Sequence, residues 1–256
     1  MQHLNISKPQ PHIALVALQG AGRYNLMSYA MLNELWTAAN ELQGDPAVRV
    51  VVISGAADAF SAGMNLKQAE VKDYQSFTIE ERVAIHSIGA RACASWENLD
   101  AVTICAIEGY CLGGGLAFSV ACDYRVAASG AVIGAPELRN GMNMSWQSIP
   151  RLVSLIGPAR TRKLVMLGEN VDAAKAESWG LVDTVAKPAH AQEEAMRMAQ
   201  ALLAMPGLPL RMTKQAINVA ANTLNHAVSY MDLEQYVVCQ STETHQQALS
   251  AFFQRN

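Results

Sequence analysis

The chain has 256 residues, of which 51% are hydrophobic, and its formal net charge is −3. A chain of this length and apolar content can bury a substantial core as one or two domains. The slightly acidic balance, without any basic stripe, argues against a nucleic-acid partner.

The N-terminal segment and the cysteines restrict the class of protein further. The first residues lack the charged lead-in and small-residue cleavage site of a signal peptide, and no window has the length of a membrane span. We therefore expect a cytoplasmic protein without membrane contact. The five cysteines form no CxxC pair, and no histidines stand at ligand spacing, so we expect reduced, buried thiols and no metal.

The first third of the chain alternates strands with helices. Apolar β-branched runs predict strands over residues 12–18 and 48–54, and residues 28–43 repeat apolar side chains at helical spacing. After a loop, residues 76–95 read as a helix and residues 101–107 as a third buried strand.

The pattern continues to residue 190 and then changes. YRVAAS and AVIGAPE predict two short strands, which are followed by helices over 148–157 and 158–168, so we predict an α/β fold. We assign residues 1–190 to the core and the helix-like residues 191–256 to a C-terminal region. That region has little core of its own, so we expect it to pack on the body or on another subunit, and we expect an oligomer.

Two glycine-containing turns are candidates for a binding site. Gly113, Gly114 and Gly115 precede a helix, where bare backbone N–H groups and the helix dipole favour negative charge. Their spacing is neither a GxGxxG fingerprint nor a P-loop, and such turns also serve close packing of a strand on a helix. FSAGMNLK (60–67) is a second small-residue turn. Two such turns can each direct one backbone donor at a single oxygen, as an oxyanion hole does.

Four segments in fixed order resemble one family. AFSAGMNLK, IEGYCLGGGLAFSVACDYRVA, IGAPELRNGMN and GLVDTV are similar to the enoyl-CoA hydratase/isomerase family, the crotonase superfamily, and the likeness covers almost the whole chain. The resemblance implies a crotonase-like spiral of ββα units with a C-terminal helical region for oligomerisation. It also implies a homotrimer or a dimer of trimers, and an acyl-CoA substrate of fatty acid metabolism. Coenzyme A is then part of the substrate, and no separate cofactor is expected.

The resemblance assigns roles to the two turns. The N–H groups of Met64 and Gly114 would stabilise the thioester enolate, while Gly113 and Gly115 would let the turn approach the thioester. A side chain at Gly114 would crowd the substrate.

The resemblance also implies a coenzyme A site. The expected coenzyme A path is lined by Ala62, Asn65, Leu66 and Lys67, although many relatives have Asp at the position of Asn65. The nucleotide would also be contacted from a neighbouring subunit by Phe252 or Phe253 and by Arg255.

The carboxylates distinguish between reactions of this family. Hydratases of this family carry a glutamate at each of two motif positions. This chain has Ala117 at the first of them, just after the three glycines, and Glu137 at the second, in GAPEL. Moving a double bond needs one base, so we expect an isomerase with Glu137 as that base. MNMSWQ (142–147) replaces the glycine-rich run of hydratases, and its Met142 and Trp146 would wall an acyl pocket.

Several alternatives stay open. If Glu108, Glu80 or Glu81 pointed into the site, a two-carboxylate hydratase would be restored, although acids at such positions are usually solvated. Decarboxylation and thioester hydrolysis are further family reactions. The absence of a glutamate at Ala117 also allows a non-catalytic protein that only binds acyl-CoA.

Overall fold

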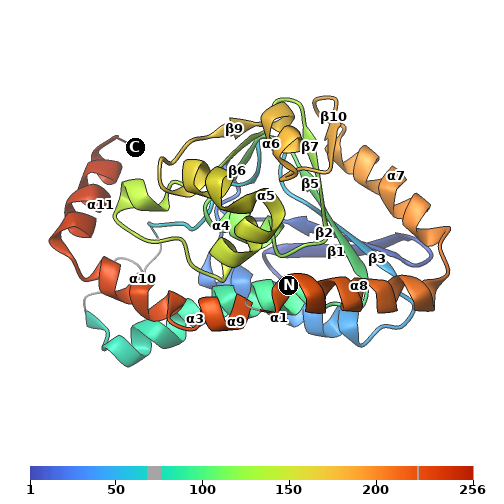
Figure 1. Ribbon diagram of the computed structural model, residues 1–256, viewed down its shortest axis with the longest axis horizontal. Coiled ribbons are helices and arrows are strands. Elements are labelled where there is room, and N and C mark those ends of the chain that lie inside the picture. Colours follow the sequence, from blue (N-terminus) through green and yellow to red (C-terminus); the bar gives the residue numbers. More distant parts are fainter. Residues whose placement is uncertain (68–75, 224, 256) are drawn as a thin grey trace.

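The computed structural model of the chain describes residues 1–67, 76–223 and 225–255 (Figure 1). The larger sheet has the strand order β1-β2-β3-β5-β7-β10, in which β1 is antiparallel to β2 and the other pairs are parallel. Its strands are β1 (Leu4–Gln10), β2 (Ile13–Leu18), β3 (Val50–Ser54), β5 (Val102–Ile107), β7 (Tyr124–Ala128) and β10 (Thr184–Ala186). Three of them, β2, β3 and β5, are the predicted apolar runs, and β7 lies in the strand predicted at YRVAAS. Apolar periodicity does not predict β1, because Leu4 alone among its seven residues is buried.

A second, smaller sheet has the strand order β4-β6-β8-β9, with only the β8–β9 pair antiparallel. Its strands are β4 (Ala59–Ser61), β6 (Tyr110–Leu112), β8 (Val132–Gly134) and β9 (Val171–Asp172). Of these only β8 lies in a predicted strand, because two or three residues are too few to show a period. Each glycine turn therefore follows a short strand of this sheet, and not the long strand before it.

The chain alternates between the two sheets in a repeating pattern. A strand of the large sheet leads to a strand of the small sheet and then to a helix, as in β3-β4-α3 and β5-β6-α4. The helices of this part are α1 (Tyr29–Gln43), α3 (Ile79–Glu97), α4 (Gly114–Ser119), η2 (Glu137–Asn140, a 3-10 helix), α5 (Ser148–Val165) and α6 (Ala173–Trp179). This is the predicted spiral of ββα units.

The C-terminal helices pack on the body of their own chain. They are α7 (Ala191–Leu203), α8 (Gly207–Asn222), α9 (Asn225–Val228), α10 (Asp232–Gln240) and α11 (Glu243–Arg255). The alanine face of α7 covers one side of the large sheet, where it forms a second core with Ile13, Val50 and Ile104 (Figure 1). Helix α10 packs on α3, and α11 packs on η2.

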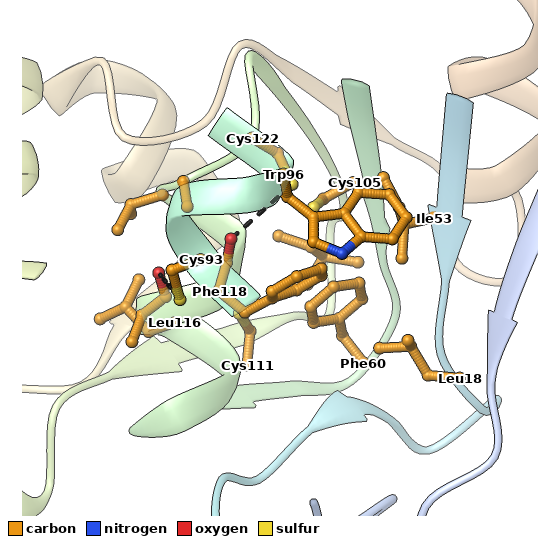
Figure 2. Packing of buried hydrophobic residues seen from close by; sticks show 14 of the residues in the cluster. Leu18, Ile53, Phe60, Cys93, Trp96, Cys105, Cys111, Leu116, Phe118 and Cys122 are labelled. Carbon is orange, nitrogen blue, oxygen red and sulfur yellow. Dashed lines mark hydrogen bonds between the residues drawn. The ribbon is translucent and has the colours of Figure 1, made fainter. Parts of the chain in front are cut away.

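The core beneath α4 holds the glycine turn in place. Figure 2 shows the rings of Trp96 and Phe118 close to Phe60, and the centroids of Trp96 and Phe118 lie 5.5 Å apart in an edge-to-face arrangement. Trp96 also donates its indole N–H to the carbonyl of Leu35 at 2.9 Å. A helix of six residues is not stable alone, so these contacts fix α4.

The cysteines are free thiols, as predicted. Cys93, Cys105, Cys111 and Cys122 are buried, and only Cys239 is partly exposed. Burial raises the pKa of Cys93 and Cys111 to about 12, so their reactive thiolate forms are suppressed. In the described part of the chain, no helix is both long and apolar enough to cross a bilayer, and no cluster of three metal-binding side chains occurs.

Candidate active site

A cavity of about 840 Å³ brings the predicted site residues together. Its walls come from the two glycine turns, η2, the segment before α5, and helices α10 and α11. Among the lining residues are Ala62, Met64, Asn65, Leu66, Lys67, Gly113, Gly114, Ala117, Glu137, Met142, Trp146 and Phe252. Of the predicted site residues, only the side chain of Arg255 lies outside the described part of the chain.

The two glycine turns lie against each other. Gly63 adopts a φ of +94°, and a Cβ placed there would lie 3.0 Å from the carbonyl oxygen of Leu112 and 3.2 Å from the nitrogen of Gly114. Glycine is thus required at position 63 both by its backbone angle and by the neighbouring turn. This contact places the backbone of residues 63–64 next to that of residues 113–114.

Each turn leaves one N–H group available to a ligand. Met64 pairs with Met27 in a bridge that uses the carbonyl of Gly63 and the N–H of Asn65, so its own N–H points the other way. Gly114 is the first residue of α4, where N–H groups have no intrahelical partner. Neither N–H donates to an acceptor within the described residues. Two backbone donors without an acceptor, on adjoining turns, are the groups that an oxyanion hole requires.

Glycine is required at positions 113 and 115 for two different structural reasons. Gly113 has a φ of +54°, and a Cβ there would lie 2.8 Å from Oε1 of Glu137. At Gly115, however, a Cβ would lie 2.3 Å from the carbonyl oxygen of Ser61. The expectation that Gly115 lets the turn approach the thioester is therefore corrected, since this glycine lets α4 pack on β4.

Glu137 faces the turn from η2. Its Oε2 atom is buried and accepts no hydrogen bond from the described residues. Burial of the carboxyl raises its pKa from the ordinary 4.5 to about 7. A carboxyl with such a pKa can both take up and release a proton near neutrality, as a general base or acid must do.

The three other acids considered from the sequence lie elsewhere. The carboxylate of Glu108 accepts from the N–H groups of Ala189 at 3.2 Å and Ala191 at 2.8 Å, at the start of α7. Glu81 accepts from the backbone N–H of Thr78 at 2.8 Å and completes the capping box of α3. Glu80 is exposed in the first turn of the same helix.

The cavity wall also includes two residues of the expected coenzyme A site, Lys67 and Phe252. Lys67 is exposed there, and its N–H is held by the side chain of Asn65 at 3.0 Å. Phe252 lines the cavity of its own chain, because α11 packs on η2. Phe253 packs edge-to-face on Phe252, with ring centroids 5.8 Å apart, and is 38% exposed.

No sequence motif predicts several of the residues that line the cavity. Tyr24, Tyr110 and Arg139 line the cavity from three separate loops or short elements, and Tyr236 reaches it from α10. The last of these lies 99 residues beyond Glu137 in the chain, so only the packing of α10 on α3 brings it near the site. The sequence IEGY, next to the glycine motif, is the one local hint of Tyr110.

Comparisons with known proteins agree with the fold and the site. The enoyl-CoA hydratase/isomerase family matches residues 9–256, and the chain belongs to this family, which forms part of the crotonase superfamily. It is 31% identical over 248 residues to the probable enoyl-CoA hydratase echA8 of Mycobacterium tuberculosis, covering 95% of this chain and 92% of that relative. The protein is thus an enzyme of the hydratase/isomerase kind.

Two solved structures show the likeness of the fold. An enoyl-CoA hydratase from Mycobacterium avium subsp. paratuberculosis superposes with a TM-score of 0.87 at 22% identity, over 99% of this chain and 96% of that chain. A monofunctional enoyl CoA isomerase from M. smegmatis superposes with a TM-score of 0.72 at 26% identity, over 87% of this chain and 95% of that chain. Both named reactions thus occur among proteins of this fold.

Proposed function

We propose that this enzyme is an enoyl-CoA isomerase that moves a double bond from C3–C4 to C2–C3 of an acyl-CoA thioester. The observation that carries the proposal is that Glu137 is the only carboxylate among the described residues lining the cavity. Where hydratases of the family have their other glutamate, the buried methyl group of Ala117 lines the cavity. One base is sufficient for isomerisation, whereas hydration also needs a group to orient the water.

The proposed mechanism uses the geometry of the two turns. The thioester oxygen accepts hydrogen bonds from the N–H groups of Met64 and Gly114. Glu137 removes a proton from C2, and the electron pair of that C–H bond delocalises onto the thioester oxygen. The protonated Glu137 then returns the proton to C4, while the C2–C3 double bond forms and the C3–C4 double bond is lost. Each backbone donor is worth about 3 kcal/mol in such a transition state.

The burial of Glu137 supports its role in both half-reactions. An ordinary carboxylate is a weak base, and its conjugate acid exists only in acidic solution. A pKa of about 7 makes Glu137 a stronger base toward C2 and keeps the protonated form accessible for C4. Gly113 places no side chain between this carboxyl and the turn.

Hydration is the second candidate, and it is favoured by the name of the M. tuberculosis relative. It requires a second group to orient the water, and the described lining offers hydroxyl side chains such as Tyr236 and Ser145 but no second carboxylate.

The absorbance of the conjugated 2-enoyl thioester tests the proposal. Purified enzyme mixed with a 3-enoyl-CoA is expected to increase this absorbance, and Glu137→Gln is expected to abolish the increase. An absorbance that instead falls when a 2-enoyl-CoA is supplied, with no reaction of the 3-enoyl-CoA, would establish a hydratase. Binding of both thioesters without turnover of either would contradict the proposed isomerisation.

A further inference from the structure

The backbone at Trp146 has an unusual conformation. Trp146 has a φ of +62° and Gln147 a φ of +58°, both in the left-handed region that non-glycine residues seldom adopt. Two successive residues of this kind are costly, and they persist only where the surroundings hold them in place. The contacts of this segment must therefore stabilise the conformation.

The peptide group between these residues is held from both sides by charged side chains. Nη1 of Arg151 donates to the carbonyl oxygen of Trp146 at 2.7 Å, and the N–H of Gln147 donates to Oδ2 of Asp232 at 2.7 Å. Arg151 is 2% exposed and is fixed in turn by two hydrogen bonds to Glu97, at 2.8 and 2.9 Å. The two side chains on this peptide come from α5 and α10, so tertiary contacts impose the strained backbone.

The result of this conformation is the placement of the indole ring. A Cβ at Gly89 of α3 would lie 2.0 Å from Cε2 of Trp146, so the ring rests directly on the helix backbone. A Cβ at Gly114 would lie 2.9 Å from Cη2 at the other end of the ring. The expected crowding at Gly114 therefore involves Trp146 before any substrate. The six-membered ring stands beside the glycine that offers its N–H to the thioester oxygen.

We propose that Trp146 is a specificity-determining residue that closes the acyl end of the cavity and restricts the enzyme to short-chain acyl-CoA substrates. The inference rests on the proposed function only in so far as the thioester oxygen binds at Gly114. The carbons beyond C2 then extend from a carbonyl held next to the indole, and a long chain meets the ring. Since the ring cannot move back into Gly89, it acts as a fixed wall.

Binding of saturated acyl-CoA thioesters tests the proposal without requiring turnover. Calorimetry is done with butyryl-CoA and decanoyl-CoA on the wild type, on Trp146→Ala and on a control, Trp179→Ala, a partly buried tryptophan on α6 that does not line the cavity. We expect the wild type to bind decanoyl-CoA no more tightly than butyryl-CoA. In Trp146→Ala the affinity for decanoyl-CoA should rise at least about tenfold relative to butyryl-CoA, because added methylene groups become buried.

Two results would overturn the proposal. One is a wild type that already prefers decanoyl-CoA by tenfold or more, and the other is an unchanged affinity ratio in Trp146→Ala. If that variant does not fold, Trp146→Leu provides the same comparison with a smaller loss of volume. A wild type that binds neither thioester overturns both this inference and the proposed function. Binding with the expected ratio but without isomerisation of a 3-enoyl-CoA overturns the proposed function alone.

Asp232 is then a positioning residue for the ring. Asp232→Ala removes the acceptor of the Gln147 N–H and is expected to shift the chain-length ratio in the same direction as Trp146→Ala, by a smaller factor. Asp232→Asn retains an oxygen that can accept this hydrogen bond and should restore the wild-type ratio. A purely structural role would lower stability in Asp232→Ala without moving the ratio, and that result would remove Asp232 from the proposal.

Discussion

Burial of the Glu137 carboxyl favours catalysis but lowers the stability of the folded protein when the carboxyl is charged. Its carboxyl is buried without a hydrogen-bonding partner for Oε2 among the described residues, which raises its pKa to about 7. The same burial that makes it a useful base also makes its charged form costly. Glu137→Gln keeps the shape of the side chain and removes its titratable group. It therefore leads to two predictions, one for catalysis and one for stability.

The first prediction concerns catalysis. Glu137→Gln is expected to lower kcat for the isomerisation by roughly 10²–10⁴-fold, because the base is lost while the oxyanion hole is retained. In the wild type the base must be deprotonated in the free enzyme, so kcat/KM should rise with pH and level off above about 7. Initial rates measured between pH 5 and pH 9 check both statements. A flat profile from pH 5 upward would contradict the assignment of the base.

The second prediction concerns the free energy of unfolding. Burial raises the folded-state pKa of Glu137 from 4.5 to about 7, so the folded state binds this proton more tightly than the unfolded state. The resulting stabilisation is complete below about pH 4.5 and is lost as the pH rises through about 7. At pH 8 Glu137→Gln should therefore be more stable than the wild type by about 3 kcal/mol.

Urea unfolding of both proteins measures this difference. The stability difference should grow between pH 5 and pH 8 and stay constant above that range. Glu81→Gln is a suitable comparison, because Glu81 lies at the exposed start of α3 and not in the cavity. A wild type that is as stable as Glu137→Gln at pH 8 would show that the charged carboxylate is not buried in solution.

At the scale of elements, the contact between α3 and the segment before α5 depends on one glycine. The backbone of Gly89 is helical and has no positive φ, so the backbone does not require glycine at this position. The three nearest atoms to a Cβ placed there all belong to the indole of Trp146. Position 89 is thus restricted by one side chain from another element.

A double-mutant cycle tests this contact. Gly89→Ala alone is expected to destabilise the protein by about 1–3 kcal/mol, because the methyl group overlaps the indole. In the Trp146→Ala background the same substitution should stabilise by up to about 1 kcal/mol, since alanine is a better helix former than glycine. Denaturant unfolding of the four proteins supplies the cycle. Equal effects of Gly89→Ala in both backgrounds would contradict the packing described above.

At the scale of the whole molecule, the C-terminal helices have three different surroundings. Helix α7 covers the large sheet, and α10 and α11 form one wall of the cavity. Helix α8 differs, because it packs on α5 yet leaves large apolar side chains exposed. Leu208 is 67% exposed, Met212 59% and Val219 72%. Adjacent exposed apolar side chains on one helix are characteristic of protein–protein interfaces.

The expected trimer or dimer of trimers leads to a prediction for this helix. Sedimentation should give the wild type a mass several times the 27.6 kDa of one chain. Val219→Glu combined with Met212→Glu should shift the distribution toward the monomer, because burying two unpaired charges is costly. Glu194→Gln on α7, which changes a charge on another helix, is the control. A wild type that sediments as a monomer would remove the prediction of an oligomer.

The sequence by itself determined those helices, strands and site residues that depend only on residues close together in the chain. Local periodicity was sufficient for β2, β3, β5 and α1, because each is long enough to show its repeat. The family motifs placed Met64, Gly114 and Glu137, which the structure brings into one cavity. These predictions needed only short stretches of chain in a fixed order.

The tertiary structure decided what depends on contacts between distant segments. The three-residue strands β4 and β6 exist because they pair with each other, and Gly115 is glycine because it meets β4. The fold of α11 onto η2 places Phe252 in the cavity of its own chain. Likewise, side chains from α5 and α10 hold the strained backbone at Trp146. Such contacts leave no periodic pattern in the sequence, because the partners are far apart along the chain and meet only when the core has formed.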